Sequence, residues 1–341
     1  MKSGIALEVY NCYMSRNKNH KSRRGLKFVL VLLVLLSLGV GAWYLVDWLQ
    51  PQVPITSYKF QTPKDESAVI AAVGDIACLP GKPVTPTECQ HEAVYGLVEL
   101  HKPDEILLLG DIQYDDGELF DFQNSFDKSW GNSKDKMRPV PGNHEYEIAG
   151  ASGYYDYFGE RAGEKDKGYY SFDVGKWHAV ALNSVCDEAG GCGPGSPQYE
   201  WLKKDLAENP EPCTLAFWHH PVYTSGQKAL IPGELDHAKP FWELLTQAKT
   251  DVILNGHDHL YERFGGQNVD GVESLTGPLQ FTVGTGGKSL YKQTSIAANS
   301  KAVIDDSFGI LLLELKAEEY VWQFIDTANL VRDQGSAKCV N

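Results

Sequence analysis

The stretch ILLLGDIQYDDG, residues 106–117, places an acidic turn directly after an apolar run. The run Ile106–Leu109 has the length and composition of a buried strand. Asp111 follows the end of the run, and Tyr114 lies three residues further on, next to two more acids. A loop of this kind binds a cation, caps a helix or is a solvated turn, and the rest of the chain has to distinguish these alternatives.

Five apolar runs, this one included, are each followed by side chains that can bind a metal ion. These side chains belong, in chain order, to Gly74–Asp75, Asp111 with Tyr114, Asn143–His144–Glu145, His219–His220 and His257–Asp258–His259. In open α/β sheets, sites form beyond the carboxyl ends of the strands, so these five ends are expected to converge. Each motif alone is an ordinary turn, but five in order at strand ends indicate a function. Carboxylates, imidazoles, an amide and a phenol together predict a site for two metals.

The alternation of apolar runs and turns predicts one α/β (α+β) domain over residues 67–341. The strand candidates are 68–73, 105–110, 138–142, 214–218, 251–256 and 279–284, with hairpins at 169–184 and 308–326. The helix candidates are 88–101, 197–208 and 237–249. Such a pattern predicts a mixed sheet, or two packed mixed β-sheets, flanked by helices.

Charge is unevenly distributed over the 341 residues. Residues 1–27 contain seven basic residues and one acid, a net charge of +6, so residues 28–341 carry −20 and the whole chain −14. Because residues 28–341 carry so large a negative charge, they are a poor candidate for binding the phosphates of nucleic acid. If they handle a phosphate, a metal ion is the obvious source of positive charge.

The N-terminal part of the chain predicts export of the body. Residues 28–46 contain no charged residue, and about 20 apolar residues span a bilayer. The basic flank favours the cytoplasm, which places the body outside as a single-pass, membrane-anchored protein. A cleaved signal peptide, with Val40 and Ala42 before the cut, would give a secreted protein instead. The predicted organisation is a cytoplasmic basic segment (1–27), a transmembrane anchor (28–49), a Pro-rich linker (50–66) and the folded domain (67–341).

Cysteine usage agrees with export. Cys12 lies in the basic segment, and the six remaining cysteines are an even number, as disulfides require. Six cysteines allow 15 pairings. Short loops favour Cys78–Cys89 and Cys186–Cys192, which leaves Cys213–Cys339 to hold the C-terminus.

The ordered motifs resemble those of the calcineurin-like metallophosphoesterases over about residues 68–287. Many members have a histidine two residues after the first aspartate, where this chain has Ala77. Purple acid phosphatases lack that histidine and use a tyrosine three residues after the second aspartate, which is the position of Tyr114. The segments SPQYEWLKKDL (196–206) and GHDHLYERF (256–264) are similar to that branch as well. The resemblance implies a metallophosphoesterase-like four-layer sandwich.

Carried onto this chain, the resemblance implies two metal ions. The first would be held by Asp75, Asp111, Tyr114 and His259, and the second by Asp111, Asn143, His219 and His257, with Asp111 as the bridge. Anionic oxygen ligands, a phenolate among them, suit Fe(III), whereas imidazole and amide ligands suit a divalent ion such as Fe, Zn or Mn. The pair would lower the pKa of a bound water, present hydroxide to phosphorus and neutralise the charge that develops on phosphate.

Three histidines are candidates for contacting the phosphate or protonating the leaving group. His144 is placed to contact phosphate or to act as the acid. Relatives often have a further histidine where this chain has Lys228. His220 and His237 are the candidates to replace that histidine near the substrate.

Three functions are therefore distinguished. The first is an extracytoplasmic acid phosphatase-like enzyme that acts on small phosphomonoesters. The second uses the same site on diesters, as a phosphodiesterase or nucleotide hydrolase. The third is a non-catalytic surface binding protein, which predicts missing ligands, whereas every expected ligand position is filled.

Overall fold

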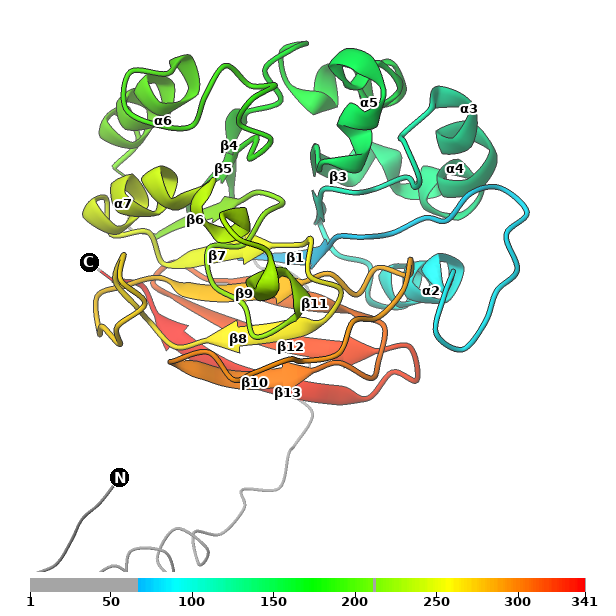
Figure 1. Ribbon diagram of the computed structural model, residues 1–341. Helices are drawn as coiled ribbons and strands as arrows, with labels where there is room; N and C mark the ends of the chain where they lie inside the picture. The colour runs from blue at the N-terminus through cyan, green and yellow to red at the C-terminus, as the bar shows by residue number, and fades with distance from the viewer. Residues whose placement is uncertain (1–66, 211–212, 341) are drawn as a thin grey trace, which may run out of the picture. The chain divides into compact units, whose positions relative to one another are not determined.

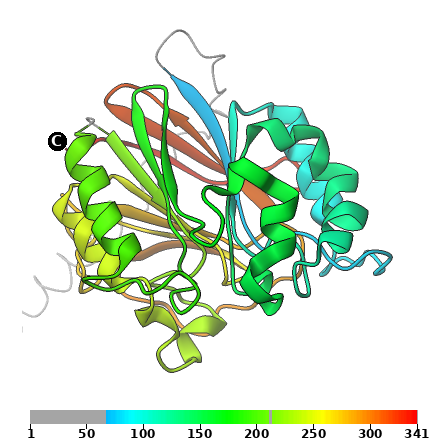
Figure 2. The same cartoon turned by 90° about the horizontal axis from the view of Figure 1, so that it is seen from above.

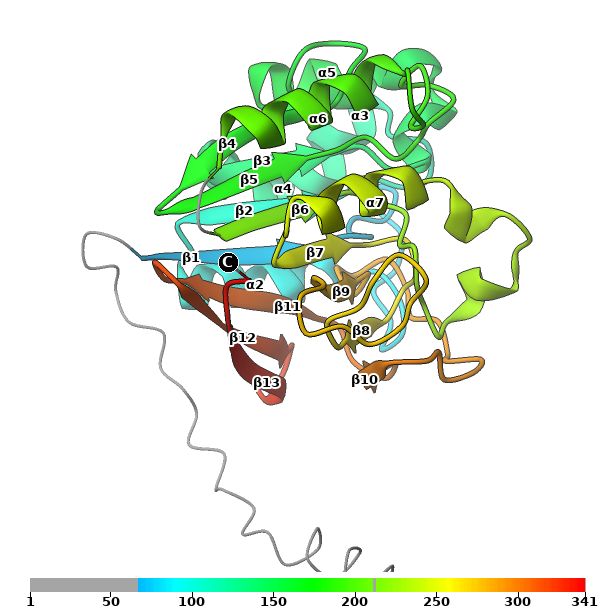
Figure 3. The ribbon, with the colours of Figure 1, turned by 90° about the vertical axis from the view of Figure 1, so that its left-hand side faces the viewer.

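The computed structural model describes residues 67–210 and 213–340, in which two mixed β-sheets are packed face to face (Figure 1). The first sheet has the order β13-β12-β11-β1-β2-β3, in which β1, β2 and β3 pair in parallel and the other neighbours pair antiparallel. Its strands are β1 (Ala68–Val73), β2 (Glu105–Leu109), β3 (Met137–Val140), β11 (Gly309–Leu315), β12 (Glu319–Asp326) and β13 (Val331–Lys338). Figure 3 shows β1 between β2 and the antiparallel β11.

The second sheet has the order β10-β8-β9-β7-β6-β5-β4, with β5, β6, β7 and β9 parallel. Its strands are β4 (Tyr170–Val174), β5 (Trp177–Ala181), β6 (Cys213–Phe217), β7 (Val252–Asn255), β8 (Tyr261–Phe264), β9 (Leu279–Val283) and β10 (Ser300–Ile304). All six predicted single strands and both predicted hairpins are present, so the predicted class of two packed mixed sheets is confirmed.

Helices cover the outer face of each sheet (Figure 2). The first sheet carries α2 (His91–His101), α3 (Leu119–Asp121), α4 (Asp127–Ser129) and α5 (Ser152–Phe158), with the π-helix η1 (Phe122–Phe126) and the 3-10 helices η2 (Trp130–Lys136) and η5 (Gly159–Ala162). The second sheet carries α6 (Pro197–Glu208) and α7 (Lys239–Gln247). The result is the expected order of helix, sheet, sheet and helix layers.

The alternation of side chains along β1 explains why the sheets stack. Ile70 and Ala72 lie in the core between the two sheets, while Ala71 and Val73 lie in the core beneath the helices. Successive side chains of a strand point to opposite faces, so a strand that is apolar throughout is covered on both sides. The short apolar runs of the sequence are therefore central strands of a four-layer fold.

Two of the three predicted helices are shorter than predicted. Helix α2 begins at His91 rather than at residue 88, because Cys89 has a left-handed φ of 60° and Glu88 pairs with Thr85. Helix α7 begins at Lys239 and ends before Lys249, which also has a φ of 60°. A left-handed residue cannot continue a right-handed helix.

Three disulfides join Cys78 to Cys89, Cys186 to Cys192, and Cys213 to Cys339. The pairing favoured by the short loops is confirmed. The last of these bonds joins β6 to the residue that follows β13, across 126 positions of the chain. The C-terminal strand is thereby tied to the centre of the other sheet.

No helix within 67–210 and 213–340 is long and apolar enough to cross a membrane. The predicted basic segment (1–27), anchor (28–49) and linker (50–66) lie outside the residues that the structure describes.

Candidate metal centre

The predicted ligands follow strands of both sheets and meet at one place. Asp75 follows β1 and Asp111 follows β2 in the first sheet, while His219 follows β6 and His257 follows β7 in the second. The backbone N–H of His257 donates to Asp75 Oδ2 at 2.8 Å, and His219 Nε2 lies 3.1 Å from Asp111 Oδ2. The parallel parts of the two sheets therefore present their carboxyl ends to a common site.

Three of these residues have an unusual backbone conformation. The φ angle is 61° at Asp75, 47° at Asp111 and 70° at His257. Non-glycine residues rarely adopt the left-handed region, and such strain clusters at functional sites. The neighbouring Gly142 has to lack a side chain, because a Cβ there would lie 2.2 Å from Asp111 Oδ1. The backbone is shaped to bring the carboxylates together.

The first cluster surrounds the hydroxyl group of Tyr114. This oxygen lies 2.9 Å from Asp75 Oδ1, 3.0 Å from Asp111 Oδ2 and 3.0 Å from His259 Nε2. The four side chains are all at least 96% buried. The turn quoted from the sequence thus places its tyrosine at the centre of two carboxylates and an imidazole.

The second cluster contains Asp111, His219 and His257. His219 Nδ1 lies 2.8 Å from the carbonyl of Leu109, which only accepts, so Nδ1 carries the proton. His257 Nε2 likewise donates to the carboxylate of Glu234 at 2.5 Å. In the neutral rings the remaining lone pairs, on His219 Nε2 and His257 Nδ1, face each other at 3.0 Å.

Two facing lone pairs beside a carboxylate require positive charge between them. Burial alone would lower the pKa of His219, but Asp111 outweighs burial and raises it to about 9. Burial favours the neutral acid of Asp111, yet His219 holds the pKa of that carboxyl well below its usual range. A divalent ion supplies the same charge and also accepts both lone pairs, and histidine ligands commonly donate their other N–H in this way.

Tyr114 fits a metal for a related reason. Burial, together with Asp111 and Asp75, raises the pKa of its phenol well above the ordinary value. Without a cation the group is therefore a phenol, and only a strongly acidic ion ionises it near neutrality. Asp75, Asp111, Tyr114 and His259 form a set of hard oxygen ligands with a single imidazole.

Asn143 and His144 follow β3 at the edge of the site. Asn143 Oδ1 is buried without a hydrogen-bond partner among the described residues. Buried polar atoms normally have a partner, and a bound metal ion would supply one to this amide oxygen. The His144 backbone N–H donates to Asp111 Oδ1 at 2.9 Å, and its Nδ1 bonds to the carbonyl of Asp115. The His144 side chain is 32% exposed and its ring centre lies 4.3 Å from that of Tyr114. His144 is thus the accessible imidazole of the group.

The remaining sequence candidates lie on the side of the second cluster. The ring of His220 lies against His257, and burial together with neighbouring imidazoles lowers its pKa well below the usual value. His237 is exposed, with its ring centre 5.9 Å from that of His220. Burial is the main reason why the pKa of His257 also lies well below its usual value, and neighbouring imidazoles and Lys228 contribute. Lys228 forms no ion pair within 67–210 and 213–340.

Three acids that position the site were not assigned a role from the sequence. The carboxylate of Glu145 accepts the backbone N–H groups of Asp111, Ile112, Gln113 and Gly142. Asp258 accepts Thr224 Oγ1–H at 2.8 Å. Glu234 bonds His257, as above. Glu145 and Asp258 belong to the motifs Asn143–His144–Glu145 and His257–Asp258–His259, so the sequence could have indicated a role for them. No motif surrounds Glu234 in the sequence.

The family of this chain follows from comparisons with known proteins. The model of the family described as "Calcineurin-like phosphoesterase" matches residues 68–261. Purple acid phosphatase 15 of Arabidopsis thaliana is 29% identical over an alignment of 261 residues, which covers 66% of this chain and 46% of that protein. Purple acid phosphatase 1 of Ipomoea batatas is 24% identical over 74% of this chain and 57% of its own length. The chain spans about half the length of these curated relatives.

Solved structures share the fold. Purple acid phosphatase PPD1 from yellow lupin seeds superposes with a TM-score of 0.63 at 18% identity, over 81% of this chain and 54% of that one. A structure described as "GAP50 the anchor in the inner membrane complex of Plasmodium" gives a TM-score of 0.58 at 17% identity, over 81% and 90%. The family match covers more than half of the chain and includes every strand that carries a candidate ligand, and the chain therefore belongs to the calcineurin-like phosphoesterase family, with purple acid phosphatases among its relatives.

Proposed function

We propose that this chain is a dimetal phosphoesterase that hydrolyses phosphomonoesters, in the manner of an acid phosphatase. The observation that carries the proposal is the approach of His219 Nε2 and His257 Nδ1 to 3.0 Å beside the carboxylate of Asp111, with the other nitrogen of each ring bonded to an oxygen acceptor. The relatives that match the chain are named as phosphatases, which supports the same reaction class.

In this proposal the two clusters hold one ion each. The first is held by Asp75, Asp111, Tyr114 and His259, and the second by Asp111, Asn143, His219 and His257. The oxygen-rich first set fits Fe(III), and the second set fits a divalent Fe, Zn or Mn. When bound, the ions supply Lewis acidity toward water and toward the phosphoryl oxygens.

The protein's own groups then bind and protonate. His144 is the accessible imidazole beside Tyr114, and its ring is held by the Asp115 carbonyl through Nδ1. Its Nε2 lies 3.9 Å from Asp111 Oδ2, beyond hydrogen-bond distance, and in this proposal it contacts a phosphoryl oxygen or protonates the leaving alkoxide. Lys228 is a cation without an ion pair in the described chain, and its charge suits an anionic substrate in a body whose net charge is −20.

The location of the enzyme is proposed on separate grounds. Three disulfides persist in oxidising compartments, which supports an extracytoplasmic domain. The apolar residues 28–46 support a membrane anchor, and a cleaved signal peptide is the alternative. Protease accessibility of the body in intact cells would separate an exposed domain from one that faces the cytoplasm.

Turnover by purified full-length protein tests the reaction. We expect hydrolysis of 4-nitrophenyl phosphate to exceed that of bis(4-nitrophenyl) phosphate, and Asp111→Ala or His257→Ala to abolish both. The opposite preference would favour the phosphodiesterase or nucleotide hydrolase alternative. Full activity in either variant would refute the site, and no activity in the metal-loaded wild type would favour the non-catalytic binding protein.

A further inference from the structure

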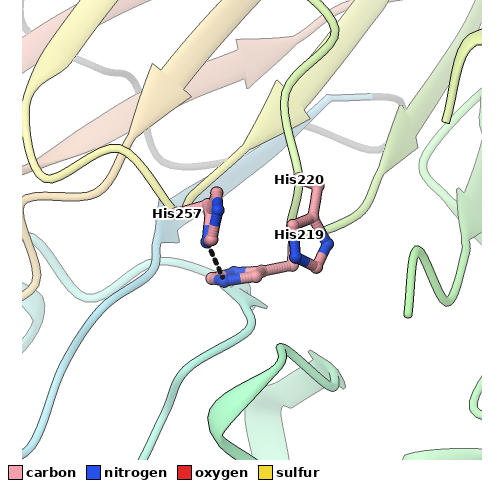
Figure 4. A group of neighbouring side chains, drawn as sticks. All are labelled: His219, His220 and His257. Atoms are coloured by element: carbon pink, nitrogen blue, oxygen red, sulfur yellow. Dashed lines mark hydrogen bonds between the residues drawn. The ribbon is translucent and has the colours of Figure 1, made fainter. Parts of the chain in front are cut away.

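Three imidazoles, not two, gather on the side of the second cluster. Figure 4 shows His219, His220 and His257 together, with the hydrogen-bond contact between His219 and His257 marked. Their ring centres are 4.9 Å apart for His219 and His220, 4.8 Å for His219 and His257, and 4.3 Å for His220 and His257. One nitrogen of each ring lies within 4.8 Å of the corresponding nitrogens of the other two.

These separations are those of three rings around one ion. Imidazole nitrogens bind zinc at about 2.0–2.1 Å, so the centres of neighbouring rings in such a site lie about 4.5 Å apart at a right angle and about 5.2 Å apart at a tetrahedral angle. Two of the observed separations fall in that range, and the 4.3 Å between His220 and His257 lies just below it.

His220 is held as a ligand histidine is held. Its side chain is 7% exposed, and its Nδ1 lies 2.8 Å from Ser184 Oγ. The backbone N–H of His220 donates to the same oxygen at 3.0 Å. No residue that the structure describes bonds to Nε2 of His220. In the tautomer that donates Nδ1–H to Ser184 Oγ, the lone pair on Nε2 is free and the ring is fixed by an outer partner, as is usual for ligand histidines.

We propose that His220 is a further ligand of the second metal position, an inference that rests on the proposed dimetal function. Asp111, Asn143, His219, His257 and His220 then form a set with three imidazoles. Such a set favours Zn(II) over harder divalent ions such as Mn(II) or Mg(II). His220 is accordingly neither the acid for the leaving group nor a contact of the substrate.

Metal binding by the metal-free full-length protein tests this inference, with Zn(II) alone and Co(II) alone as probes. We expect wild type to bind two ions per chain. His220→Ala and His220→Asn should bind one ion as wild type does and the other at least tenfold more weakly, with a changed Co(II) visible spectrum. His101→Ala is the matched control, because that histidine lies on α2 and bonds to Asn329 rather than to either cluster, and it should bind both ions as wild type does.

The two proposals fail in different ways. Two ions in wild type and unchanged affinity in folded His220 variants, with a raised KM, would make His220 a substrate contact and overturn the inference alone. Fewer than two ions in wild type would overturn the dimetal function itself. If circular dichroism shows that both variants misfold, unmutated protein labelled with ¹⁵N-histidine decides. Zn(II) should shift the ring nitrogens of His220 together with those of His219 and His257, and an unmoved His220 would refute the proposal.

Discussion

Glu234 is expected to set the affinity of the second metal position through His257. Its carboxylate oxygen lies 2.5 Å from His257 Nε2, and it comes from the 3-10 helix η7 (Glu234–Asp236) outside both sheets. The contact keeps the proton on Nε2 and therefore the lone pair on Nδ1, which faces His219. Without the carboxylate, the proton can move to Nδ1 and the ring can turn.

The size of the effect follows from burial and charge. A hydrogen bond to a charged group contributes about 1.5–3 kcal/mol. The His257 side chain is 3% exposed but that of Glu234 is 20% exposed, so solvent screens part of the interaction. We therefore take the lower end, about 1.5 kcal/mol, which corresponds to about tenfold in affinity. This lies at the lower limit of the 10- to 100-fold range known for outer partners of metal ligands.

The assay is competition for Zn(II) between the full-length protein and a chromophoric chelator. Glu234→Ala should lower the affinity for one of the two ions about tenfold. Glu234→Gln retains a neutral acceptor and should lower that affinity only a few-fold. Glu243→Gln on the exposed side of α7 is the control and should bind as wild type does. Equal affinities of wild type and Glu234→Ala, or an equal loss in the control, would refute the reasoning.

Three further outcomes are expected. Tyr114→Phe should remove the visible phenolate-to-iron band of the Fe(III)-loaded protein, and a band of unchanged intensity would exclude Tyr114 as the ligand. Burial raises the pKa of Asp251 to about 6 although two backbone N–H groups donate to it, so its stabilising contribution is complete below about pH 3.8 and is lost as pH rises to 6. The free energy of unfolding of wild type, relative to Asp251→Asn, should accordingly fall by about 2–3 kcal/mol over that interval, and a pH-independent difference in denaturant titrations would contradict this. Replacing Cys213 and Cys339 by serine should cost about 2–5 kcal/mol in the same titrations, whereas an unchanged midpoint would show that the bond constrains little.

The central strands and the position of the site could be predicted from the sequence because both depend on local patterns. A short apolar run such as Ile106–Leu109 is buried on both faces, and the polar residues that follow five such runs must lie at strand ends. The direction of parallel strands then brings these ends together without any knowledge of the sheet order.

The outer parts of the fold depend on contacts that no local pattern marks. Strand β13 is polar and partly exposed, as an edge strand can be, and it is held by β12 and by the Cys213–Cys339 bond. Apart from β3, the segment 119–162 is built of helices of three to seven residues that are stabilised by aromatic packing rather than by a periodic apolar face. Strand β8 has only four residues. In each case tertiary packing decides the structure.

The same division applies to the site. Asp75, Asp111, His219, His257 and His259 come after strands, and for that reason the sequence could predict that they lie together. Glu234 and Ser184 act through hydrogen bonds to His257 and His220, over separations of 23 and 36 residues, and they carry no motif. Their roles can be identified only when the folded chain places them beside a ligand.

The metal content of the full-length protein tests the central claim most directly. Oδ2 of Asp111 approaches side chains of both clusters, at 3.0 Å from Tyr114 Oη and 3.1 Å from His219 Nε2. The purified wild type, loaded with iron and zinc and then dialysed, should retain two ions per chain by elemental analysis, and Asp111→Asn should retain no more than one and lose phosphomonoester hydrolysis. A wild type with one ion or none, or an Asp111→Asn protein that keeps two ions and full turnover, would contradict the dimetal centre.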